Sequence, residues 1–274
     1  MSTRRIGVLL TSLGMQTIGL GAYAVALLAI GRWPSLGWEL VPWAIALAVV
    51  GVTSLAALYK AFALGPIAVV SPVVASYAAI TVVLVVIFLG ERLNAGQTAA
   101  IVLTFAGVMV ASTDVRELRR TLGRPSAPLA RQGALPLGVR IGLLATVGFG
   151  IWGALFAAAT RATDGLAIIV ALRACSVLVL AAFALARRTS FVPLAPPRLL
   201  ALVATVGVLD TGANVLLALG IQSGYASFVM TGSGAYPLIP AILAILVLGE
   251  RLAPNQYIGV GVLVAGLVAL GLQS

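Results

Sequence analysis

Long apolar stretches recur along the whole chain and are separated by short polar links. Each stretch is about 20 residues long, the length of an α-helix that crosses the hydrocarbon core of a bilayer. None alternates apolar and polar positions as a membrane β-strand does. The pattern predicts nine membrane-spanning helices, at residues 7–31, 42–63, 66–89, 95–113, 139–160, 166–186, 199–219, 225–248 and 255–273.

The composition agrees with an all-α integral membrane protein and argues against several kinds of metal site and against disulfides. Of the 274 residues, 61% are hydrophobic and 9% are charged, whereas soluble domains are about 25% charged. The sequence has no His and one Cys, which argues against a His- or Cys-ligated metal site and against disulfides. No nucleophile–base pair is visible. We therefore expect no metal, no cofactor and no enzyme activity.

The distribution of basic residues predicts the orientation in the membrane. The net charge is +10, with 17 Lys and Arg. If the N-terminus lies inside, three Arg fall on outer segments, Arg32, Arg92 and Arg161, and most of the others fall on inner ones. Loops rich in Lys and Arg face the cytoplasm. We expect a multi-pass protein of the cell (inner or cytoplasmic) membrane, with a cytoplasmic N-terminus and a cytoplasmic segment 114–138. The basic charge is then explained without nucleic acid.

The sequence contains an internal repeat. Gly90-Glu91-Arg92-Leu93 recurs at residues 249–252, a shift of 159 positions. The same shift matches further identical pairs, which are Gly65 with Gly224, Tyr77 with Tyr236, Leu89 with Leu248, Gln97 with Gln256, Ala106 with Ala265 and Gly107 with Gly266. The copies lie five spans apart, an odd number, so matching helices should cross the membrane in opposite directions. Inverted repeats of this kind are typical of secondary transporters.

These motifs carry a resemblance to a known family. With the two Gly-Glu-Arg-Leu turns, the segment Lys60–Pro66 and the segment Ala171–Arg173, the chain resembles the EamA-type permeases of the drug/metabolite transporter superfamily. The resemblance implies ten helices in two five-helix halves and transport of small metabolites. The sequence departs from it because the first half shows four spans, as though its first helix were missing. We divide the chain into a first repeat at 1–113, a connector at 114–138 and a second repeat at 139–274.

Two tyrosines mark the predicted substrate path. Tyr77 and Tyr236 lie near the centres of matching spans, too deep for the interfacial aromatic belt. A two-fold axis in the membrane plane maps one midplane position onto the other, so the two rings should face each other across a cavity. The alternative is that each tyrosine packs in the helix bundle and hydrogen-bonds to a neighbouring helix.

The segment 231–240 combines hydroxyl groups with helix-breaking residues. Thr231 and Ser233 are predicted to contact the substrate, together with Ser76 in the other repeat. Broken helices are tolerated in a membrane where protein or water satisfies the freed backbone groups. The predicted kink or gating residues are Pro72, Gly232, Gly234, Pro237 and Pro240. Because both glycines lack a counterpart in the first repeat, the helix of the second repeat should be the more irregular. Packing without a functional role is the alternative.

Two charges lie inside predicted spans, where a charge is costly and usually functional. Arg173 and Asp210 are placed at depths that differ by about 3 Å, given a rise of about 1.5 Å per residue. They can therefore pair, and Asn214 lies one turn from Asp210 on the same face. The pair is either a structural salt bridge or a substrate site. In a substrate site, Arg173 would hold a carboxylate or phosphate, and Asp210 would hold an amine or a proton.

The Gly-Glu-Arg turns are predicted to be structural. Gly90 and Gly249 suit helix C-caps, and Glu91 and Glu250 are expected at the N-termini of the helices that follow. The small residues of the last span, Gly259, Ala265, Gly266 and Gly271, allow close helix contact, either within the molecule or in a homodimer.

Together these features predict a permease for a small organic metabolite. We expect an amino-acid-like or other amphoteric or anionic solute, moved outward by alternating access around a midplane cavity, with protons as a candidate coupling ion. Two alternatives stay open. One is a flippase for a lipid-linked sugar or headgroup, and the other is a membrane scaffold or sensor that transports nothing.

Overall fold

The computed structural model describes residues 8–65, 67–113, 115, 137–187, 197–235 and 253–273. Every regular element in these parts is an α-helix, so the predicted fold class is confirmed. The helices are α2 (Val8–Ala29), α3 (Leu40–Leu64), α4 (Ile67–Ala75), α5 (Tyr77–Leu89), α6 (Ala95–Ser112), α8 (Leu137–Ala162), α9 (Gly165–Ala186), α10 (Pro197–Ser223), α11 (Ala226–Gly234) and α13 (Pro254–Gly271).

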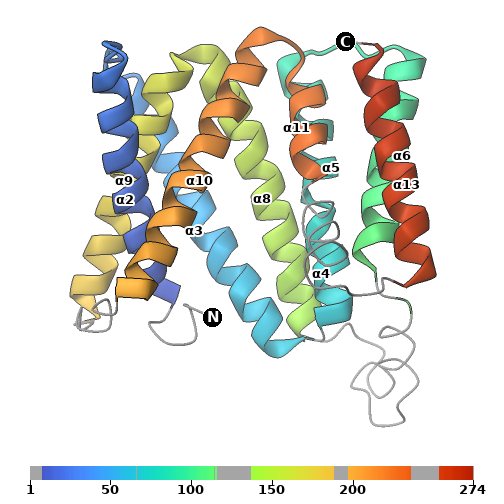
Figure 1. Ribbon diagram of the computed structural model, residues 1–274, viewed down its shortest axis with the longest axis horizontal. Coiled ribbons are helices and arrows are strands. Elements are labelled where there is room, and N and C mark those ends of the chain that lie inside the picture. The colour runs from blue at the N-terminus through green and yellow to red at the C-terminus, as the bar shows by residue number, and fades with distance from the viewer. Residues whose placement is uncertain are drawn as a thin grey trace. The chain divides into compact units, whose positions relative to one another are not determined.

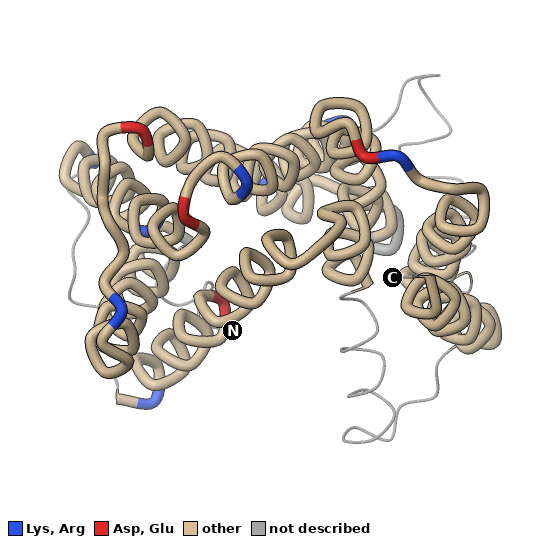
Figure 2. Tube along the Cα trace, turned by 90° about the horizontal axis from the view of Figure 1, so that it is seen from above, with Lys and Arg blue, Asp and Glu red and all other residues tan. Residues whose placement is uncertain are grey.

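Eight helical stretches in the described parts are long and apolar enough to cross a membrane. They correspond to eight of the nine predicted spans, and the ninth, 225–248, is described as far as Ala235. Few positions along the described part of the trace are charged (Figure 2). In hydrocarbon, every backbone polar group must be satisfied within the segment, which favours helices for these apolar runs.

The expected single helix over residues 66–89 is broken near its centre. The chain forms α4 and α5, with Ser76 between them. Ser76 donates both its N–H, at 3.3 Å, and its hydroxyl, at 2.6 Å, to the carbonyl of Val73. A Ser side chain that bonds the preceding turn competes with the regular helix ladder. Pro72, one turn earlier, already lacks a backbone donor.

The corresponding helix of the second repeat ends at the equivalent position. Adding 159 to the bounds of α4 gives the bounds of α11, and each helix has nine residues. Tyr77, the first residue of α5, thus corresponds to Tyr236. The residues after Ala235 up to 252 lie outside the described parts, so the expectation that this helix is the more irregular one stays a prediction.

Packing divides the chain into two compact units, Met1–Val49 with Leu155–Ser223 and Val50–Ala154 with Gly224–Ser274. In the first unit, α2, α9 and α10 pack against one another (Figure 1). The Tyr23 hydroxyl donates to the Leu166 carbonyl at 3.4 Å, which ties α2 to the start of α9. Each unit combines segments from both halves of the sequence.

In the second unit, α6 and α13 lie side by side (Figure 1). Gly107 lies against Leu263, and Gly266 lies against Thr104. Residue numbers rise along one helix as they fall along the other, so the two helices are antiparallel. Adding 159 to the bounds of α6 gives the bounds of α13. Equivalent helices of the two repeats therefore run in opposite directions, as the odd spacing predicted.

The repeat extends to the hydrogen bonds at the two helix starts. The Gln97 side chain accepts the Asn94 N–H at 3.0 Å, and the Gln256 side chain accepts the Ala253 N–H at 2.9 Å. Each glutamine also donates across the pair, at 3.3 Å, to a backbone carbonyl of the other helix or the residues directly after it. These matching bonds fix the antiparallel register of α6 and α13.

Candidate functional site

The candidate site lies in the first unit, where α2 packs closely against α10. Gly19 of α2 lies against Thr211 and Gly207 of α10, and Gly207 in turn lies against the backbone of Met15. A side chain at either glycine would collide with the facing helix, so the absence of a Cβ allows the backbones to approach. This approach places polar residues of both helices beside α9.

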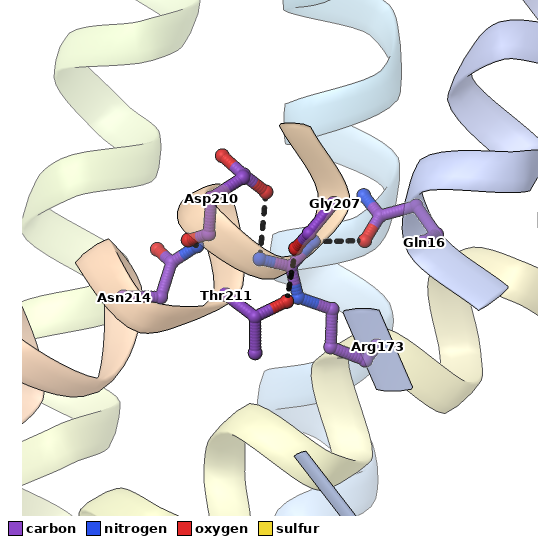
Figure 3. Close-up of polar contacts among 6 residues, drawn as sticks. All are labelled: Gln16, Arg173, Gly207, Asp210, Thr211 and Asn214. Carbon is purple, nitrogen blue, oxygen red and sulfur yellow. Dashed lines mark hydrogen bonds and ion pairs between the residues drawn. The ribbon is translucent and has the colours of Figure 1, made fainter. Parts of the chain in front are cut away.

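Arg173 of α9 lies between these polar residues (Figure 3). Its Nη2 donates to Asp210 Oδ2 at 2.7 Å, and its Nη1 donates to Gln16 Oε1. Arg173 is the ninth of 22 residues in its helix, and Asp210 is the fourteenth of 27 in α10. The pairing that the helix depths predicted is confirmed, and it lies near the middle of both spans.

The two ionic partners differ sharply in exposure. The Arg173 side chain is 2% exposed, whereas the Asp210 side chain is 46% exposed. A buried guanidinium needs an opposite charge and further hydrogen bonds, and Asp210 and Gln16 supply them. The Nε atom of Arg173 is buried and has no hydrogen-bond partner among the described residues. The cluster therefore combines a buried cation with an accessible anion.

Two more polar side chains of α10 bond within their own helix. The Asn214 Nδ2 donates to the main-chain carbonyl of Asp210 at 2.9 Å. The Thr211 hydroxyl donates to the Gly207 carbonyl at 2.8 Å (Figure 3). Asn214 thus lies one turn from Asp210, as predicted, and one of its two amide N–H donors is engaged by the backbone.

Gln16 is absent from the residues predicted above, although the sequence holds a signal for it. It is the one amide side chain among the 22 residues of α2. An amide in a membrane span needs a hydrogen-bond partner. The sequence does not reveal that this partner is Arg173, because the pairing depends on how α2 packs against α9.

Tyr77 and Ser233, both predicted substrate residues, meet in the second unit. Tyr77 starts α5 directly after the helix break, and Ser233 of α11 lies within reach of its side chain. Its ring also packs against Phe149 of α8, with centroids 5.9 Å apart and planes tilted by 55°. Tyr236 lies outside the described residues, so the facing pair of tyrosines stays a prediction.

The other two predicted hydroxyl residues bond to their own helices. The Ser76 hydroxyl is bonded to Val73, as described above. Thr231 is completely buried, and its hydroxyl donates to the Ser227 carbonyl at 2.7 Å. Both hydroxyls are therefore engaged by backbone carbonyls of the preceding turn.

The predicted kink residues have different surroundings. Pro72 is buried within α4, and Gly234 packs against Ala78 of α5, where a Cβ would collide. Gly232 is exposed and faces open space. Pro237 and Pro240 lie outside the described residues.

The expected role of Glu91 at the start of the next helix is wrong. That helix, α6, is capped by Asn94. The Glu91 carboxylate instead accepts the backbone N–H groups of Ala226, at 2.7 Å, and Ser227, at 3.0 Å. These are the first two residues of α11, where free N–H groups favour an anion. Gly90 ends α5 in a left-handed conformation, with φ of 68°, as predicted. Residues 249–252 lie outside the described parts.

Comparison with known proteins identifies the family. The model of the EamA-like transporter family matches residues 3–113 and again residues 136–272. The chain belongs to the EamA-like transporter family. The two matches end 159 residues apart, at the shift of the internal repeat. The protein is therefore a multi-pass membrane transporter built from two repeats of this family.

The fold of this EamA-like transporter is also found among solved structures. The chain is similar to one described as "Crystal structure of protein", with a TM-score of 0.77 and 18% sequence identity, over 100% of this chain and 91% of the other. Among curated proteins, none is similar enough to count as a match. Within the described residues, no group of three or more His, Cys, Asp or Glu could hold a metal ion.

Proposed function

We propose that this transporter exports a small amino-acid-like metabolite by alternating access, with Asp210 in contact with the solute. The observation that carries the proposal is the half-exposed carboxylate of Asp210 in the middle of α10. A charge at that depth is costly against acyl chains. We therefore propose that the exposed side of this carboxylate borders a water-filled solute cavity.

The repeat offers a second argument that this polar cluster serves transport rather than the fold. The position equivalent to Arg173 in the first repeat is Gly14, and the position equivalent to Asp210 is Gly51. The first repeat uses the same helix order without either charge. The ion pair is therefore a feature of one repeat, which is expected of a residue set selected for a ligand.

Tyr77 and Ser233 are proposed as further substrate contacts. They lie beside the interruption between α4 and α5, where the helix ladder is already broken. Broken helices at membrane depth are typical of transporter binding sites. A Tyr ring and hydroxyl together suit a solute with both apolar and polar parts.

Uptake into proteoliposomes tests the proposal. Vesicles with the full-length chain should exchange at least one labelled amino acid faster than empty vesicles. Asp210→Asn should slow that exchange by about tenfold or more, the effect of losing about 1.4 kcal/mol of interaction. If transport is coupled to protons, a pH gradient across the vesicle membrane should make uptake faster than it is without a gradient. Asp210→Asn should abolish that increase. Movement of a lipid-linked sugar or headgroup across the vesicle bilayer, without exchange of any amino acid, would favour a flippase instead.

A further inference from the structure

Building on the proposed function, the geometry points to recognition of a substrate ammonium group by Asp210, with Arg173 as a positioning residue that holds the carboxylate in place. The protein would then select solutes that carry a primary amine. Arg173 would not be the binding group for a substrate carboxylate.

Exposure separates the roles of the two charges. With 2% of its side chain exposed, Arg173 offers almost no surface to a solute, and two of its nitrogens are engaged by Gln16 and Asp210. Its remaining nitrogen, Nε, is buried as well. A substrate carboxylate therefore cannot reach the guanidinium unless α2, α9 and α10 separate.

Asp210 has the complementary arrangement. Arg173 occupies Oδ2 on one side of the carboxylate, and Oδ1 accepts no hydrogen bond from the residues that the structure describes. Figure 3 shows this second oxygen pointing away from Arg173. An ionised carboxylate has about four acceptor positions, so it can hold Arg173 and still bind a second donor group.

The next polar group along α10 adds a neutral amide beside the carboxylate. Asn214 uses one N–H of its Nδ2 to bond the Asp210 main-chain carbonyl, and its amide oxygen is a further acceptor close to Asp210. The charge that this patch offers to a solute is therefore the negative charge of Asp210. An ammonium group brings three N–H donors and a positive charge, whereas a carboxylate would meet like charge.

The test uses three matched sets of probes on the full-length chain in nanodiscs. Each set has an amino acid, its decarboxylated amine and its deaminated acid, with leucine, phenylalanine and tryptophan as parents. A ligand that binds the folded state raises the midpoint of thermal unfolding. We expect the amine of at least one set to raise it in proportion to concentration, and the matching acid to leave it unchanged.

Variants assign the effect to Asp210. Asp210→Asn should weaken amine binding by about tenfold or more. The double variant Arg173→Met with Asp210→Leu removes both charges, so it leaves no unpaired ion to unfold the protein, and it should also lose amine binding. Glu39→Gln removes an exposed carboxylate of the same unit and should bind amines like the wild type.

Several outcomes would overturn the inference. These are acid binding without amine binding, amine binding that survives in both Asp210 variants, and no amine binding in any set. The proposed function can be tested separately from each of these outcomes, because solute exchange in vesicles can be measured for labelled solutes that carry an amine and for labelled solutes that do not. Transport of a deaminated acid would support the proposed transport function and contradict recognition of an ammonium group.

Discussion

At the scale of single residues, the two members of the Arg173–Asp210 pair depend on each other to different degrees. Arg173 depends on its partners because the protein surrounds it, whereas Asp210 is half exposed and can be hydrated. Losing one partner of a buried pair is costly because the other charge stays unpaired. The cost should therefore depend on which of the two residues is removed.

This asymmetry gives the first prediction. Asp210→Leu should lower the free energy of unfolding by about 3–5 kcal/mol, because it leaves a buried guanidinium without a counter-ion. Arg173→Met should cost less, since water can solvate the remaining carboxylate. The double variant should be more stable than Asp210→Leu alone. Equilibrium unfolding in detergent checks this order, and equal losses in the two single variants would contradict it.

Helix depth was sufficient to predict that Arg173 and Asp210 can pair, because charges at one level of adjacent helices attract each other where hydration is poor. Depth does not distinguish the exposed partner from the buried one. That difference arises from how α2 covers Arg173, which brings in Gln16 as well. A neutral amide gives a weaker sequence signal than a charge, so the third member of the cluster was missed.

At the scale of helices, glycines determine how closely α6 and α13 approach. Gly266 lies against the backbone of Thr104, whereas Gly261 on the same helix has no heavy atom within 4 Å of an added Cβ. The predicted contact of small residues in the last span thus occurs within the molecule at Gly266 and Gly259. Gly271 has open space around it and takes no part in this seam.

The two glycines provide a matched pair of variants. Gly266→Ala should lower the free energy of unfolding by about 1–3 kcal/mol, as overpacking of a close contact does. Gly261→Ala should leave it unchanged or raise it slightly, because Ala favours the helix over Gly. Thermal unfolding of both proteins under the same conditions compares them directly. A larger loss in Gly261→Ala would show that the helices do not pack through this seam.

Sequence patterns predicted the helices better than the places where they are interrupted. Pro72 indicated an irregularity in the third span, but the helix breaks at Ser76, four residues later. Proline disturbs the turn before it, while at the break the Ser76 hydroxyl bonds the Val73 carbonyl, and Tyr77, the next residue, packs against Phe149. Phe149 comes from a distant part of the chain, so such packing cannot be read from the local sequence.

At the scale of the whole molecule, two kinds of organisation overlap. The repeat divides the sequence into a first half and a second half, and identical residues at a fixed shift revealed it. Packing instead combines parts of both halves in each compact unit. The boundary between the units falls inside α3 and inside α8. Hydropathy reports burial in lipid for each span separately, and it contains no record of which spans pack together.

The inverted arrangement predicts opposite sidedness for equivalent helix starts. In a background with Cys175→Ala, a cysteine at Arg92, before α6, should react with an impermeant maleimide in intact cells. A cysteine at Pro254, the start of α13, should react only after permeabilisation. Both native positions are exposed, and the assignment of sides follows the distribution of basic residues. Labelling of both from one side would contradict the inversion.

The contact of Glu91 with α11 has a consequence for biosynthesis. The carboxylate and the two N–H groups that it accepts are 135 and 136 positions apart, so Glu91 leaves the ribosome long before these two partners exist. A chain that stops before residue 226 would lack both N–H groups, which makes translation of the later portion a condition for forming this contact.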